Sequence, residues 1–149
     1  MQYIKNGNFS QGFDGWQGPD GFEPDFQAHG QGQSVCVPIA TLISQSLPDL
    51  PGQTLRIEFD VLSADPHIDA AAFVVSVGGF DAEGSAQVSP VPGIATQQWQ
   101  RLSVRLYFLE DLNNCFLNVT TSRQEESGAR MAPDPVRFGD FSLMEEEPS

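Results

Sequence analysis

The chain has 149 residues and carries 20 Asp and Glu against 7 Lys and Arg, which gives a net charge of −13. Its length suits a single domain, and its apolar fraction of 40% is that of a globular protein. The charge argues against nucleic acid and anionic membranes as partners, because phosphates are repelled and few cations can release counterions.

The first element is the stretch NGNFSQGFDGW at 6–16. It is typical of a strand end, here at 6–8, followed by a tight turn that closes on Trp16. Gly12 and Gly15 allow the chain to turn. We expect the role of this stretch to be architectural.

The first half of the chain continues with a predicted loop at 17–34, which is rich in Gly, Pro and Gln, and with a strand at 41–48. In TLRIEFDVLS at 54–63, apolar residues alternate with polar ones, so one side faces a core and the other faces water or a ligand. The segment AAAFVVSVGGF at 70–80 begins apolar on both sides, which is typical of a central strand.

The second half shows the same alternation between turn-rich segments. Its predicted strands are 97–108, 115–122 and 134–144, and its predicted loops are 81–98 and 123–134. A short acidic tail at 145–149, expected to be disordered, would follow a domain of residues 1–144. At least six strands and no helix predict an all-β fold, a two-sheet antiparallel β-sandwich of jelly-roll type.

The N-terminus and the longest apolar run are the two places where the sequence could encode a signal peptide or a membrane span, and neither does so. The first ten residues lack the apolar stretch of a secretory signal peptide, and the apolar run at 70–75 is too short to cross a bilayer. We therefore expect a cytoplasmic protein, or one exported without an N-terminal signal. Whether Cys36 and Cys115 form a disulfide, and which oligomer forms, stay open.

The polar side chains of the predicted strands form one candidate binding site. If these strands share a sheet face, five side chains approach one another: Arg56, Glu58, Arg105, Tyr107 and Asn118. Such a set of donors, acceptors and one ring is suited to the vicinal hydroxyls of a sugar. The alternative is a solvated sheet face with ion pairs, since any half-exposed strand has this spacing.

Four segments in order resemble the galactose-binding-like jelly rolls, most closely the carbohydrate-binding modules of families 4, 9 and 22. They are NGNFSQGFDGW, ISQSLPDLPGQTLRIEFDVLS, QQWQRLSVRLYF and VRFGDFSLME, and they span about residues 5–144. The resemblance implies a jelly-roll sandwich that binds a glycan and carries no catalytic site.

Many of these modules hold a structural calcium between the first motif and the last strand. Here Ser10 stands where the family has Glu or Asp, and Gly139 where it has the first of two aspartates. Calcium prefers several carboxylates among six to eight oxygens. The resemblance therefore implies a weakened calcium site, with Asn8, Ser10 and Asp140 nearest the ion.

The aromatic residues are few for a sugar-binding protein. Trp16 and Trp99 fall at framework positions of the family, so both are expected in the core. Tyr107 is the first candidate to stack on a pyranose ring, followed by Phe22 and Phe26. The alternative is that the two phenylalanines anchor their loop on the sandwich.

Signals of catalysis are poor. His29 and His67 are isolated, are expected in loops and lack a metal-ligand spacing. Glu58 and Asp60 are neighbours on one strand, not carboxylates on opposite sides of a substrate. We predict a non-catalytic carbohydrate-binding module. The alternative is a protein-interaction or structural unit on the same scaffold, as in a phage tail, a secretion machine or a toxin complex.

Overall fold

The computed structural model describes residues 2–38, 41–67, 69–121 and 135–146. Within these ranges the chain forms nine strands and no helix, and thus no helix that could span a membrane. The strands are β1 (Asp25–His29), β2 (Gly32–Val37), β3 (Leu42–Leu47), β4 (Thr54–Ser63), β5 (Ala71–Phe80), β6 (Ala86–Ala95), β7 (Gln100–Tyr107), β8 (Asn113–Thr121) and β9 (Val136–Glu145).

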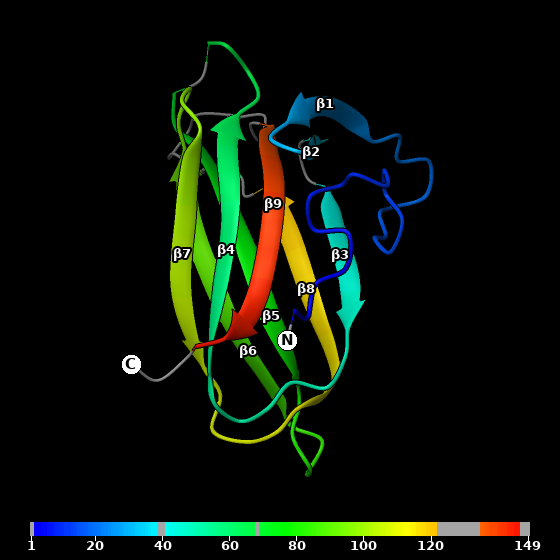
Figure 1. Cartoon of the computed structure of the whole chain (residues 1–149), viewed down its shortest axis with the longest axis vertical. Coiled ribbons are helices and arrows are strands. Elements are labelled where there is room, and N and C mark those ends of the chain that lie inside the picture. Colours follow the sequence, from blue (N-terminus) through cyan, green and yellow to red (C-terminus); the bar gives the residue numbers. More distant parts are fainter. Residues whose placement is uncertain (1, 39–40, 68, 122–134, 147–149) are drawn as a thin grey trace, which may run out of the picture.

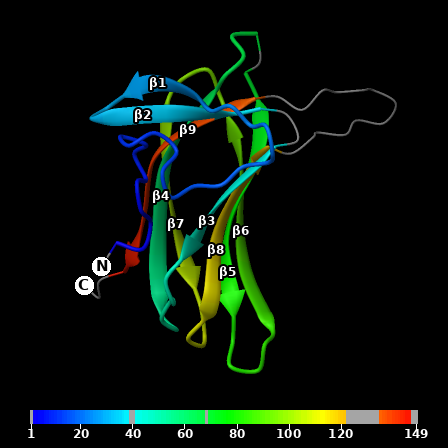
Figure 2. The ribbon, with the colours of Figure 1, turned by 90° about the vertical axis from the view of Figure 1, so that its right-hand side faces the viewer.

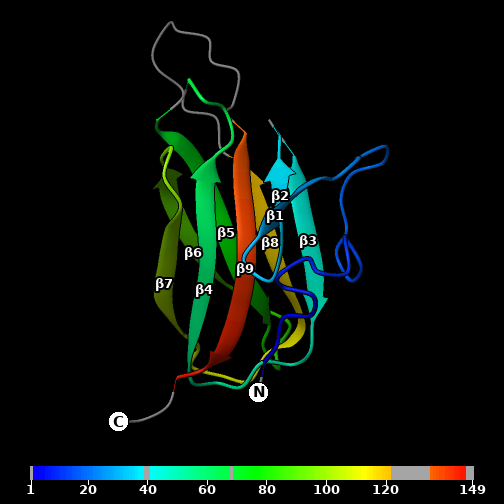
Figure 3. The same cartoon turned by 45° about the horizontal axis from the view of Figure 1, so that its top comes forward.

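The strands form two antiparallel sheets that pack face to face (Figures 1 and 2). The five-stranded sheet has the order β1-β2-β9-β4-β7, and the four-stranded sheet has the order β3-β8-β5-β6. In Figure 3, β4 and β9 lie in front of β5 and β8. The predicted all-β jelly-roll sandwich is confirmed, and β5 is the interior strand that its apolar sequence predicted.

The core between the sheets is rich in phenylalanine. The ring of Phe59 on β4 lies 5.9 Å from that of Phe73 on β5 and 5.2 Å from that of Phe141 on β9. Phe138 is also buried although it is three residues from Phe141, because the β4–β9 register shifts at this point. The bulge turns Asp140 outward with a φ of 53°, so β9 buries two rings and still presents a carboxylate.

Two of the predicted loops contain strands, so those predictions are wrong in part. Residues 17–34 include β1 and the first half of β2, which form a hairpin whose turn contains Gly30 at a φ of 58°. Residues 81–98 include β6, which carries Pro90 and Pro92. β6 is an edge strand, where a residue without an N–H is tolerated. The predicted loop 123–134 lies outside the described residues.

The stretch 6–16 is a series of turns, and no strand precedes β1 among the described residues, so the predicted strand end at 6–8 is wrong. The Asn6 side chain donates to the carbonyls of Gly12 and Asp14 at 3.0 and 2.9 Å. The indole N–H of Trp16 donates to the Asn6 carbonyl, and the ring is buried as predicted. These contacts fit the architectural role expected for this stretch.

The end of the domain lies beyond the predicted boundary at 144. Strand β9 includes Glu145, and the backbone N–H of Glu146 donates to the Thr54 carbonyl at 3.0 Å. The acidic tail is thus ordered at its first two residues, which corrects that part of the prediction. Residues 147–149 lie outside the described part of the chain.

Candidate functional site

The outer side of the five-stranded sheet carries four of the five side chains predicted to meet. Arg56 and Glu58 on β4 lie directly opposite Arg105 and Ser103 on β7, and Tyr107 follows at the end of β7. We call this surface the charged face. Its members on β4, β7 and β9 are Arg56, Glu58, Asp60, Arg101, Ser103, Arg105, Tyr107, Asp140, Ser142 and Met144.

Arg101 holds the upper part of the charged face together. Its guanidinium donates to Asp60 at 3.0 Å and to the carboxylates of Glu58 and Asp140 at 3.4 Å. Burial lowers the pKa of Arg101, but the bond to Asp60 and the three negative charges outweigh it and raise the pKa above its ordinary value. Glu58 and Asp60, considered above as a carboxylate pair, thus share one arginine.

The lower part of the charged face is held by Glu146. Its carboxylate accepts from Nε and Nη2 of Arg56, both at 2.7 Å, and from Nε of Arg105 at 3.2 Å. The bond from Arg56 is the largest cause of a lowered pKa at Glu146. Ser103 continues the network, since it accepts from Arg56 at 2.6 Å and donates to Glu58 at 2.9 Å. Most polar groups of this face therefore bind one another.

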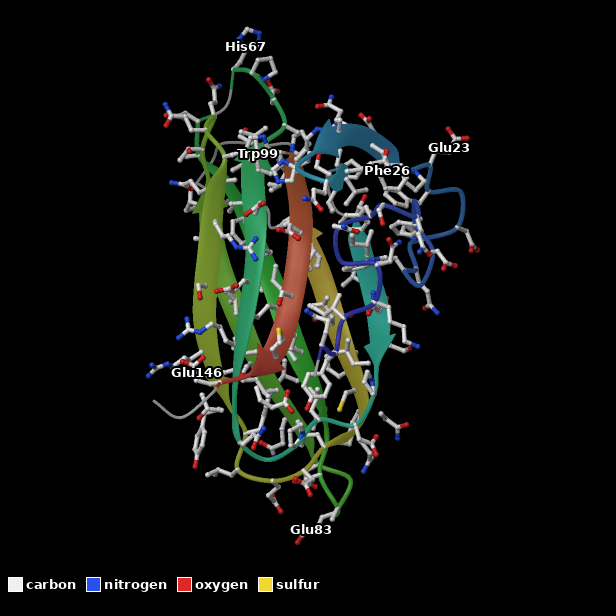
Figure 4. All side chains as sticks on the ribbon, in the orientation of Figure 1. Glu23, Phe26, His67, Glu83, Trp99 and Glu146 are labelled. Carbon is white, nitrogen blue, oxygen red and sulfur yellow. The ribbon has the colours of Figure 1, made fainter. Side chains whose placement is uncertain are left out.

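Trp99 does not belong to the core, so that prediction is wrong. It precedes β7, is 39% exposed, and stacks on the ring of His29 with 4.0 Å between centroids. His29 ends β1 instead of lying in a loop, and its Nε2 is 2.7 Å from an oxygen of Asp60. A β-carbon at Gly139 would lie 2.8 Å from the His29 ring, so the imidazole occupies the space of an aspartate there. Figure 4 shows Trp99 at the end of the sheet opposite Glu146.

Asn118, the fifth predicted residue, lies on β8 in the other sheet, so the prediction that it joins Arg56 and Arg105 is wrong. Alternation along a strand shows which of its side chains share a face, but not which strands share a sheet. Asn118 instead belongs to the outer side of the four-stranded sheet, which we call the uncharged face. Its members are Leu42, Ser44, Ser46, Ala72, Val74, Ser76, Gly78, Val88, Pro90, Pro92, Ile94, Phe116, Asn118 and Thr120.

One row of small polar side chains crosses the uncharged face. Ser44, Asn118 and Ser76 are register partners on three adjacent strands. Gln17 extends the row, because its backbone bonds to Ser44 in both directions, at 2.7 and 2.8 Å. Within the described ranges, none of these four side chains has a hydrogen-bond partner. The row spans roughly 14 Å at the usual strand spacing.

Apolar side chains border this row on both sides. The next row on one side contains Leu42, Val74 and Pro92 together with Thr120. The next row on the other side contains Phe116 and Val88 together with Ser46 and Gly78. None of the 14 members of this face is charged, although the chain carries 27 charged residues. The surface therefore offers free amides and hydroxyls between two rows that are largely apolar. Sequence reasoning missed Ser44, Ser76 and Gln17, because only the register aligns them.

The remaining aromatic candidates differ in exposure. Tyr107 is 65% exposed at the end of β7, so its ring is open to a ligand. Phe22 and Phe26 are half-buried and pack against the core. The ring of Phe22 lies 5.5 Å from that of Phe13, and the ring of Phe26 lies 6.1 Å from that of Phe9. These contacts correspond to the anchoring alternative.

The residues expected nearest a calcium ion line a cavity of about 620 Å³, which Lys5 also lines. The Asn8 side-chain oxygen accepts the Ser10 N–H at 3.1 Å, and the Asn8 carbonyl accepts from Gln33 at 2.8 Å. Asp140 pairs with Arg101. Among the described residues no three His, Cys, Asp or Glu gather in a way that could hold a metal. This donor set does not fit calcium, which needs six to eight free oxygens.

The other candidate residues show no catalytic arrangement. His67 lies in the β4–β5 connection, where its backbone N–H donates to Asp65. Cys36 and Cys115 are both free thiols, and burial raises the pKa of each. A thiol with a raised pKa is a poor nucleophile.

No protein-family model and no curated protein sequence matches the chain. Solved structures do. The CBM22-1 xylan-binding domain of Paenibacillus barcinonensis Xyn10C superposes with a TM-score of 0.69 at 16% identity, over 100% of this chain and 95% of that one. The C-terminal family 22 carbohydrate-binding module of Clostridium thermocellum Xyn10B superposes with a TM-score of 0.70 at 12% identity, over 96% of this chain and 92% of that one.

A third likeness comes from a phage protein. The enzymatically active domain of tailspike protein 4 from bacteriophage CBA120 superposes with a TM-score of 0.65 at 10% identity, over 98% of this chain and 22% of that one. At such identities the likeness shows the fold alone. The fold is a jelly-roll β-sandwich like that of these carbohydrate-binding modules.

Proposed function

We propose that this protein is a non-catalytic glycan-binding domain that binds a neutral polysaccharide across the uncharged face. The row of Ser44, Asn118 and Ser76 carries the proposal. Its amide and hydroxyls have no partner in the described part of the chain, so they are available to sugar hydroxyls. The bordering Val74, Pro92 and Phe116 suit the C–H faces of pyranose rings.

Charge supports a neutral ligand. A chain with a net charge of −13 repels acidic polymers, whereas a neutral polysaccharide meets no such repulsion. The jelly-roll fold is also that of solved xylan-binding and other carbohydrate-binding modules. The charged face is less suited to a neutral glycan, because a ligand there must break existing ion pairs.

The test is affinity electrophoresis of the purified chain in gels with xylan, mixed-linkage β-glucan, galactan or mannan. The double variant Asn118→Ala, Ser76→Ala should lose about tenfold or more in affinity for the retained polysaccharide, because two hydrogen bonds are removed. The matched control is Arg105→Ala, Tyr107→Ala on the charged face, which should bind normally. Thermal melting of each variant verifies that it is folded.

Two results would contradict the proposal. If the charged-face variant loses binding and the uncharged-face variant retains it, the glycan site is the cluster predicted from the strand pattern. If no neutral polysaccharide retards the chain, glycan binding itself is wrong. The protein-interaction alternative would then gain weight, since Leu42, Val88 and Ile94 expose apolar surface on this face.

A further inference from the structure

Two arginines stand directly opposite each other on the charged face. Arg56 on β4 and Arg105 on β7 are register partners of one antiparallel ladder. Like charges at such positions repel each other, since their β-carbons are only about 5 Å apart. An anion that bridges the two guanidinium groups removes this repulsion.

The bridging anion is Glu146, which follows the last residue of β9 and is not part of the sheet. Its carboxylate takes the bidentate position on Arg56 and also accepts from Arg105. A planar guanidinium recognises any carboxylate in this way. The sheet thus supplies a carboxylate site, and the chain itself supplies the carboxylate.

We propose that Arg56 and Arg105 form a binding site for the carboxylate of a uronic acid, and that Glu146 is its internal competitor. Three observations support an external ligand at this position. Among the arginines that the structure describes, Arg105 is the most exposed one in an ion pair, with 69% of its side chain open. Tyr107, the next outward residue on β7, presents an open ring for a sugar. One main-chain bond, from Glu146 to Thr54, joins the competitor's own backbone to the sheet.

The competition has a predictable strength. A tethered group acts at an effective concentration in the millimolar range, so free uronate binds the wild-type chain only weakly. Removal of the Glu146 charge opens the site to ligand. This site is separate from the row of Ser44, Asn118 and Ser76, so it does not depend on the proposed neutral-glycan function.

The test is calorimetric titration of the full chain with D-glucuronate, D-glucose and acetate. Glu146→Gln should bind glucuronate about tenfold or more tightly than the wild type. Glu83→Gln, which makes the same charge change in the β5–β6 loop labelled in Figure 4, should bind as the wild type does. Adding Arg105→Ala to Glu146→Gln should remove the gain, and the Nε–H NMR signals of Arg56 and Arg105 should shift with glucuronate.

The outcomes separate clearly. Equal affinity of wild type and Glu146→Gln for glucuronate overturns the proposal. If Glu83→Gln shows the same rise in affinity for glucuronate, the rise comes from the change in net charge, and the proposal is overturned as well. If the affinity for acetate rises in Glu146→Gln as much as the affinity for glucuronate, the site does not recognise the sugar and the uronate assignment is wrong. No gain for glucose is expected, because glucose lacks the carboxylate.

Discussion

The charged and uncharged faces lie on opposite sides of one sandwich and follow the same alternation of inward and outward residues. On the charged face, Arg101 and Glu146 bind nearly every polar group in reach. On the uncharged face, the amide of Asn118 and the hydroxyls of Ser44 and Ser76 bind none within the described residues. The charged face thus uses its polar groups within the fold, whereas this row of the uncharged face has unpaired polar groups in the described part of the chain.

This difference predicts different results of substitution on the two sides. Loss of a group on the charged face removes bonds that exist in the folded chain, so stability falls. Loss of a group on the uncharged face removes bonds that form only with a ligand, so binding falls and stability hardly changes.

The largest expected effect tests whether the two faces depend on a common core. Phe59 is fully buried and contacts Phe73 of the opposite sheet as well as Phe138 and Phe141 of its own. Phe59→Ala should cost about 3–5 kcal/mol in the free energy of unfolding, measured by urea denaturation. Both faces should then lose order together. If Phe59→Ala loses glycan binding but keeps the wild-type free energy of unfolding, the two faces do not depend on this core in common.

The second prediction concerns the charged face alone. Arg101→Ala leaves Glu58, Asp60 and Asp140 without their shared cation in an already acidic chain. We expect the free energy of unfolding to fall by about 1–2 kcal/mol. A fully buried network of charged hydrogen bonds would cost more, but this arginine is partly exposed to water. Arg105→Ala, at a more exposed pair, should cost about 0–1 kcal/mol. Equal urea midpoints for both variants would contradict the assignment of Arg101 as the organising residue.

The sequence predicts strands well where alternation is strong and core residues are large. Strand β4 has the predicted bounds 54–63, because four apolar residues alternate with charged ones. The sequence did not predict β1 or β6, because β1 is short and lies in a segment rich in Gly, Pro and Gln, and β6 carries Pro90, Pro92 and Gly93, which are residues that also mark turns. β6 tolerates its prolines only as an edge strand, which is a property of the whole sheet.

The candidate site could be predicted only within single strands. Arg105 and Tyr107 do share a face, as their spacing requires, and Arg56 and Glu58 lie beside them. Asn118 lies on the opposite side of the molecule, because the jelly-roll order places β8 in the other sheet. Trp99 is exposed since its partner is His29 on a hairpin that the sequence did not reveal. Register and sheet order therefore decide the site, and neither can be read from one strand.

The third prediction uses pH to weaken the charged face. The pKa of Glu146 in the folded chain lies below its ordinary value of 4.5, chiefly because of the bond from Arg56. Its stabilising contribution is therefore complete above pH 4.5 and is lost as the pH falls through the lowered folded pKa. In Glu146→Gln this part of the acid dependence should be absent in melting curves between neutral pH and pH 3. Glu83→Gln should keep the wild-type curve. Identical acid curves for all three would show that the Arg56 pair is fully screened.

The smallest expected effect is that of a chelator. The oxygens of Asn8 already accept N–H groups, and Asp140 faces Arg101, so few free oxygens are left to hold an ion in the cavity that these residues line. Melting temperatures with EDTA and with millimolar calcium should agree within error. A rise with calcium that Asp140→Asn abolishes would show that an ion displaces Arg101, and that the charged face, like the uncharged one, has groups free for a ligand. A rise that survives Asp140→Asn would place the ion elsewhere and leave the contrast between the faces intact.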